Sequence, residues 1–143
     1  PARGKVDAPA GEAPALDIDV LLGVPGVRGD RAAPMLKRLV ELFIRETDQQ
    51  VRSLLKARAD ADRQGAQRLA HKMKSAAAAV GAARLAALAR SVDGALKAGD
   101  TLDGLEEVAQ MPDAFAAYVE ALAQEGVCLD TVPPKMDLTY DRD

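Results

Sequence analysis

The chain has 143 residues, of which 48% are hydrophobic, 29% are charged and only 3% are aromatic, and its formal net charge is −3. All-β folds rely on aromatic and β-branched residues, whereas this chain contains 29 alanines and no tryptophan, so a helical fold is expected. The net charge argues against broad attraction to nucleic acid. Because no apolar run reaches about 18 residues, no direct contact with a membrane is expected.

The placement of proline predicts where the folded part begins and ends. Residues 1–15 are rich in proline, alanine and glycine without periodicity, and they are predicted to form a flexible linker. Residues 127–143 are predicted to form a polar tail. The folded domain is therefore expected over residues 16–126, a length that suits one hydrophobic core.

The first two helices are predicted from capping signals and periodicity. A short helix is expected over residues 17–22. A long helix follows, with Asp30 as its N-cap and Pro34 in its first turn, and it is expected to end near Ala59. Its apolar residues recur at spacings of three and four, which is typical of an amphipathic helix: Leu36, Leu39, Val40, Phe43, Ile44, Val51, Leu54 and Leu55.

Three further helices are expected over residues 62–81, 83–98 and 102–124. Pro112 lies inside the last of these and is predicted to kink it or to split it in two. The short connections favour antiparallel neighbours. The predicted fold is therefore all-α: an antiparallel up-down four-helix bundle with a short N-terminal helix.

The segment 62–81 contains the only histidine of the chain, His71. On a helical wheel the predicted buried stripe consists of Leu69, Met73, Ala76 and Val80. His71 then lies on the outer face, which it shares with Gln67, Lys74, Ser75 and Ala78. The face is free of bulky residues beyond His71, so another protein surface could approach it closely.

This arrangement favours covalent transfer of a phosphoryl group. A neutral imidazole is a good nucleophile. If His71 accepted a phosphoryl group, the ammonium of Lys74 at i+3 and the hydroxyl of Ser75 at i+4 would lie within reach of the new charge. Phosphoryl transfer depends mainly on positioning and charge stabilisation, so a sparse site suffices if a partner supplies the metal and the second reacting group.

Other interpretations of His71 are open from the residues alone. An exposed histidine on a helix is most often simply solvated. A metal site is disfavoured because one histidine and the remote Cys128 cannot complete a tetrahedral shell. No nucleophile elbow and no glycine-rich phosphate loop is present, so neither a serine hydrolase nor a nucleotide site of the chain's own is expected.

The stretch from residue 69 to residue 100 resembles histidine-containing phosphotransfer (HPt) domains. Residues that fall on the family pattern in register are Ala70, His71, Lys74, Ser75, Ala77, Val80, Gly81, Ala82, Leu85, Leu88 and Asp93. Upstream, Leu16, Asp17 and the segment 39–62, with its pair Leu42 and Phe43, are similar to the first helices of the family. The resemblance covers residues 16–125.

The resemblance implies a role for several residues. His71 would be phosphorylated, Lys74 would support the phosphoryl charge, and Gly81 would permit a tight turn. Ser75 stands where glycine is commoner in the family. Asp93 stands where glutamate or glutamine is frequent, and as the shorter acid it is expected to reach the region of His71 less well.

The resemblance also implies partners. The chain would accept a phosphoryl group from a receiver-domain aspartate of a response regulator and pass it to another receiver, with Mg²⁺ held by the receiver and no cofactor held by this chain. We expect receivers to dock over Gln67, Lys74, Ala78 and Arg84, although for Arg84 a solvated side chain is the alternative. Whether the chain is classed as an enzyme stays open, because it is a phosphocarrier without its own ATP site.

The remaining expectations concern the context of the domain. A cytoplasmic monomer is expected. If the domain is part of a sensor kinase, that kinase would tether it to the inner membrane. The proline-rich start favours the C-terminal domain of a hybrid sensor kinase, and a free-standing protein is the alternative. Two other functions stay open: a helical docking module without phosphotransfer, and an adaptor that dimerises through alanine faces.

Overall fold

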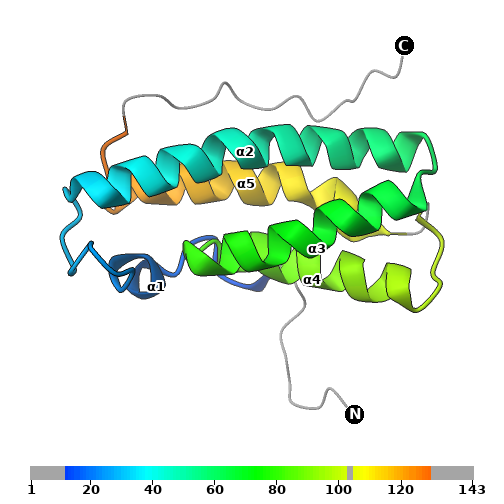
Figure 1. Ribbon diagram of the computed structural model, residues 1–143, viewed down its shortest axis with the longest axis horizontal. Helices are drawn as coiled ribbons and strands as arrows, with labels where there is room; N and C mark the ends of the chain where they lie inside the picture. The colour runs from blue at the N-terminus through cyan, green and yellow to red at the C-terminus, as the bar shows by residue number, and fades with distance from the viewer. Residues whose placement is uncertain (1–11, 103–104, 130–143) are drawn as a thin grey trace.

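The computed structural model describes residues 12–102 and 105–129. These residues form five helices, which are α1 (Ile18–Leu22), α2 (Pro34–Ala59), α3 (Arg63–Ala79), α4 (Ala83–Lys97) and α5 (Glu106–Gln124). Helix α2 packs on α3, α3 on α4, α4 on α5, and α5 closes the ring against α2 (Figure 1). Successive long helices run in opposite directions, and α1 lies at the end of the bundle where α3 stops (Figure 1). The predicted antiparallel up-down four-helix bundle is confirmed.

The helix boundaries agree with the prediction except at two starts. Helix α2 begins at Pro34 with Ala33 as its N-cap, not Asp30. Proline at the first helical position needs no hydrogen bond for its nitrogen, so the helix starts there. Asp30 instead accepts a hydrogen bond from the backbone N–H of Ala32 at 2.9 Å. Helix α3 does start after Asp62, as expected.

The last helix is shorter than predicted and is not divided. Helix α5 begins at Glu106 rather than at Leu102, and it continues through Pro112 without a break. Proline removes a single intrahelical hydrogen bond. Pro112 is buried in the helix contact, and packing of the apolar side of α5 holds the helix together.

The buried side of α3 agrees with the wheel at two of four positions: Met73 and Val80 are buried as predicted, but Leu69 and Ala76 give way to the residues that follow them. Ala70 and Ala77 are fully buried, whereas Ala76 is exposed and Leu69 is only partly buried. The reason is the partner helix: the contact between α3 and α4 is the most extensive in the bundle, and small residues line it. On α4 these include Ala86 and Ala89, both buried. Alanine at such positions lets two helices approach closely.

The aromatic residues of the described part of the chain fill the core. Phe43, Phe115 and Tyr118 are all buried, and the rings of Phe43 and Tyr118 meet edge to face with centroids 5.4 Å apart. The hydroxyl of Tyr118 donates a hydrogen bond of 3.0 Å to the carbonyl of Val80. Burial raises the pKa of Tyr118 well above its usual value. This hydrogen bond ties α5 to the end of α3.

The turn between α3 and α4 is held by the chain that precedes α1. Gly81 has a φ of 78°, which suits glycine, and its carbonyl accepts a hydrogen bond of 2.7 Å from the N–H of Asp17. A Cβ atom at Gly81 would collide with the carbonyl oxygen of Asp17. The tight turn inferred for Gly81 is thus present.

The folded part extends slightly beyond the predicted limits at both ends. The carbonyls of Ala13 and Pro14, expected in the linker, accept hydrogen bonds of 2.7 and 2.8 Å from the side chain and backbone of Arg84. Val127, expected in the tail, is buried in the core. The rest of the predicted linker and most of the tail, residues 1–11 and 130–143, lie outside the described residues.

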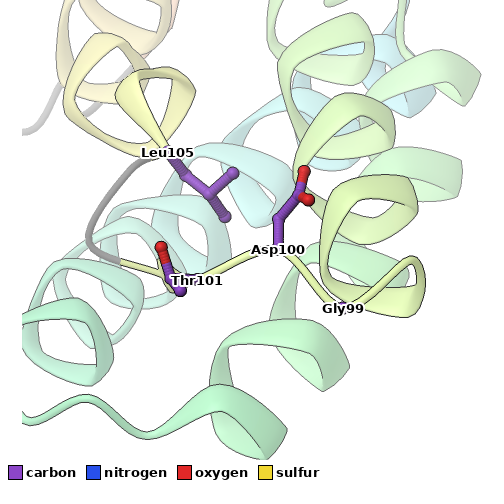
Figure 2. Close-up of a pocket in the computed structure, with 4 residues that line it drawn as sticks. All are labelled: Gly99, Asp100, Thr101 and Leu105. Atoms are coloured by element: carbon purple, nitrogen blue, oxygen red, sulfur yellow. The ribbon is translucent and has the colours of Figure 1, made fainter.

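The connection between α4 and α5 lies at the opposite end of the bundle from α1 (Figure 1). It borders a hollow of about 400 Å³ lined by Gly99, Asp100, Thr101 and Leu105. The side chains of Asp100 and Leu105 point toward the same space (Figure 2). No residue predicted for the functional site lines this hollow, so the candidate site lies elsewhere.

Candidate functional site

The candidate site is centred on His71, in the middle of α3. Its side chain is 59% exposed, which agrees with its predicted place on the outer face. Lys74 lies one turn further on and is partly buried, with 27% of its side chain exposed. Ser75 and Ala78 are both exposed on the same helix. An incoming molecule can therefore reach the imidazole directly.

A buried carboxylate on α4 connects the polar residues of this site. The side chain of Asp93 is only 2% exposed. Its oxygens lie 2.7 Å from Lys74 Nζ, 3.2 Å from Gln67 Nε2, 3.3 Å from His71 Nδ1 and 3.4 Å from Lys97 Nζ. We call these five residues the Asp93 cluster. It joins three residues of α3 to two residues of α4.

The carboxyl group of Asp93 is ionised in this setting. Burial by itself would raise the pKa of Asp93, because a buried charge loses hydration. The interactions with Lys74, Gln67, His71 and Lys97 favour the charged form more strongly, so the pKa lies well below its ordinary value. An ionised carboxylate only accepts hydrogen bonds, and this decides the direction of its bond with His71.

The structure corrects the expectation for Asp93. The shorter acid was expected to reach the region of His71 less well, yet it lies in direct contact with the imidazole. Because α3 packs closely on α4, the short side chain of Asp93 is long enough to reach the imidazole of His71. The signal was present in the sequence: Asp93 is the only acidic residue on either helix.

The structure brings together some of the predicted site residues and separates others. Gln67 and Lys74 both bind Asp93 next to His71. Arg84 does not join them, because it lies at the start of α4, beyond the end of α3, where its side chain binds Ala13. It is therefore neither simply solvated nor part of the Asp93 cluster. Lys97 was not predicted at all, although its i+4 spacing from Asp93 is a signal that could have found it.

Charge is unevenly distributed over the helices. Together α3 and α4 carry seven lysines and arginines, and their one acidic residue is buried. Helix α5 carries four acidic residues and no lysine or arginine. Although the chain has a negative net charge, α3 and α4 therefore form a basic side of the bundle. The exposed basic residues on these two helices include Arg68, Lys72, Arg90 and Lys97.

In the part of the chain that the structure describes, histidine, cysteine and acidic side chains form no group of three or more that could hold a metal ion. None of its helices is long and apolar enough to cross a membrane.

Three comparisons with known proteins give one match, which is to a family model. No curated protein and no solved structure gives a significant match to the chain. The sequence model of the Hpt domain matches residues 38–125, a range that contains most of α2 and all of α3, α4 and the Asp93 cluster. Members of this family carry out histidine phosphotransfer in phosphorelays and interact with receiver domains. With more than half of its length matched, the chain belongs to the Hpt domain family.

Proposed function

We propose that the domain carries a phosphoryl group on Nε2 of His71, taking it from the aspartate of one receiver domain and giving it to another. The observation that carries the proposal is the 3.3 Å contact between His71 Nδ1 and the buried carboxylate of Asp93. Family membership supports the reaction class. The contact explains how the imidazole of His71 would be held in the tautomer that phosphoryl transfer needs.

The contact with Asp93 selects one tautomer of His71. Because the carboxylate only accepts hydrogen bonds, Nδ1 carries the proton and donates it to Asp93. In the neutral imidazole the lone pair then lies on Nε2. The side chain is mostly exposed, so this nitrogen is available to a partner. Asp93 is a positioning residue, since it acts through His71.

The transfer step follows from this tautomer. The lone pair of Nε2 attacks the phosphorus of the receiver's aspartyl phosphate and forms an N–P bond. The P–O bond to the aspartate breaks, and its electron pair leaves with the regenerated carboxylate. Positive charge develops on the imidazole ring, whose Nδ1–H remains hydrogen-bonded to Asp93. The negative charge of Asp93 stabilises that ring, as a carboxylate stabilises imidazolium in catalytic triads.

Lys74 and Ser75 would act on the transferred group. Lys74 Nζ is held near His71 by Asp93 at 2.7 Å, so its charge is already in place before the phosphoryl group arrives. Ser75 is exposed one turn beyond His71, where its hydroxyl can donate to a phosphoryl oxygen. Gln67, one turn before His71, and Ala78, two turns beyond it, would contact the receiver.

The direct test is transfer of labelled phosphate from a phosphorylated receiver domain. The wild-type domain should acquire acid-labile label, as expected for a phosphoramidate, and His71→Gln should acquire none. Arg45→Gln is the matched control: it removes the charge of an exposed residue on α2 that is not part of the Asp93 cluster, and it should retain labelling.

Two results would contradict the proposal. Equal labelling of the wild type and His71→Gln would place the phosphoryl group elsewhere. A receiver that binds both proteins equally well but labels neither would support a docking module without phosphotransfer.

A further inference from the structure

Asp93 has two lysine partners of unequal closeness. Lys74 Nζ, from α3, lies 2.7 Å from Oδ2, which is a short, charge-assisted hydrogen bond. Lys97 Nζ, from α4, lies 3.4 Å from the same oxygen, within ion-pair range but beyond a normal hydrogen bond. The side chain of Lys97 is 53% exposed, whereas that of Lys74 is 27% exposed. Lys74 therefore forms the close hydrogen bond to Asp93, and Lys97 is a second, more distant cation near the same oxygen.

Phosphorylation of His71 would place competing demands on Lys74. The incoming phosphoryl group carries about two negative charges, and Lys74 lies one helical turn from His71. If Lys74 turns toward the phosphoryl oxygens, Asp93 loses its closest counter-ion while remaining buried. A buried carboxylate that loses its closest cation is destabilised, even though Gln67 and His71 still donate hydrogen bonds to it. Some other cation has to replace Lys74 if the phosphorylated domain is to stay stable.

We propose that Lys97 is that replacement: it moves from 3.4 Å into direct hydrogen-bond contact with Asp93 when Lys74 turns to the phosphoryl group. This inference rests on the proposed phosphorylation of His71. Lys97 thereby acts as a positioning residue, because it keeps Asp93 ionised and bound to Nδ1 while Lys74 serves the phosphate. Its i+4 spacing on α4 lets it follow Asp93 without any movement of the helices.

The other charged neighbours do not fill this role. Gln67 already donates to the second oxygen, Oδ1, and is neutral. His71 keeps its single Nδ1 contact with Oδ2. Arg90 lies on α4 one turn before Asp93 and is exposed, but it is not among the partners of Asp93. Lys97 is thus the one cation besides Lys74 that the described residues place against the carboxylate.

The experiment compares urea unfolding of the unmodified and the phosphorylated domain. His71 is phosphorylated with phosphoramidate, a small donor that needs no receiver, and unfolding is followed at mildly alkaline pH, where phosphohistidine persists. For Lys97→Gln we expect the phosphorylated form to lose about 0.5 M more in urea midpoint than the unmodified form. Lys72→Gln removes the same charge from α3 and should change both forms equally. Lys97→Arg should restore the wild-type difference.

A double-mutant cycle separates two ways in which Lys97 could act. If Lys97 works through Asp93, the extra loss caused by Lys97→Gln disappears in an Asp93→Asn background. If the extra loss persists there, Lys97 contacts the phosphoryl group directly, and the inference is wrong. An equal loss in the two forms of Lys97→Gln also overturns it.

The same proteins distinguish this inference from the proposed function. A domain that shows the Lys97 effect after chemical phosphorylation, but takes no label from receivers, would retain the inference and refute receiver transfer. A domain that is labelled by receivers but does not show the Lys97 effect would retain receiver transfer and refute the inference about Lys97. If His71 takes no phosphoryl group from phosphoramidate and none from receivers, both are refuted.

Discussion

At the scale of single residues, the site depends on one buried charge. Asp93 binds residues of two helices and touches the imidazole that the proposed reaction uses. Burial of an aspartate is unfavourable unless it is paired. Here three hydrogen bonds and the ion pair with Lys97 compensate it, so Asp93 contributes to stability as well as to the geometry of His71.

The lowered pKa of Asp93 predicts how stability depends on pH. A carboxyl group whose pKa is lower in the folded than in the unfolded state stabilises the fold above its ordinary value, near 3.8. That stabilisation is lost as the pH falls below 3.8 toward the folded-state pKa. At about pH 6, Asp93→Asn should lower the free energy of unfolding by about 1–3 kcal/mol, and by less at about pH 3.

Urea unfolding at the two pH values measures this difference. A loss that is equal at both pH values would show that the Asp93 carboxyl is not stabilised in its charged form.

At the scale of elements, the end of α3 is held from two sides. Val80 is the C-cap of α3, and its carbonyl accepts the hydrogen bond from Tyr118 of α5. Gly81 follows and is bound by the chain before α1. The helix that carries His71 is therefore anchored at its C-terminus by residues distant in the sequence.

Removal of the Tyr118 hydroxyl tests this anchor. In Tyr118→Phe the ring still packs against Phe43, but the buried carbonyl of Val80 loses its donor. We expect the free energy of unfolding to fall by about 1–2 kcal/mol, measured by urea denaturation. Because the change lies beyond the end of α3, phosphorylation of His71 should continue. An unchanged stability would mean that water satisfies the carbonyl instead.

At the scale of the whole molecule, the charge distribution gives the bundle a basic and an acidic side. Helices α3 and α4, which contribute His71 and Asp93, carry seven lysines and arginines, while α5 is acidic. A partner with an acidic surface would be attracted to the side that carries the imidazole. The expectation drawn from net charge alone missed this difference between the two sides.

Ionic strength tests the role of the basic side. We expect the rate of association with a receiver to fall about tenfold between about 50 mM and about 500 mM salt. Lys72→Glu on α3 should slow association at low salt, whereas Arg45→Glu, an equal charge change on α2, should have little effect. Similar effects of the two variants would show that total charge, rather than the α3–α4 side, controls association.

Much of the molecule follows from local sequence signals. Periodicity and capping predict the helices within a few residues, because an amphipathic helix is encoded in neighbouring positions. The exposure of His71 follows from the same wheel, as does the proximity of Lys74. The alanine content indicates closely packed helices even before their order in space is known.

The tertiary structure alone decided which residues meet. Asp93 and Lys97 join His71 because α3 and α4 approach closely along their small residues, and the separation of two helices is a property of their packing. The same holds for Arg84, which binds a carbonyl 71 residues away in sequence. The sequence by itself determined the helices and the position of His71 on an exposed helix face. Its buried counter-charge became visible only when the helices were packed together, since contacts between distant residues depend on the whole bundle.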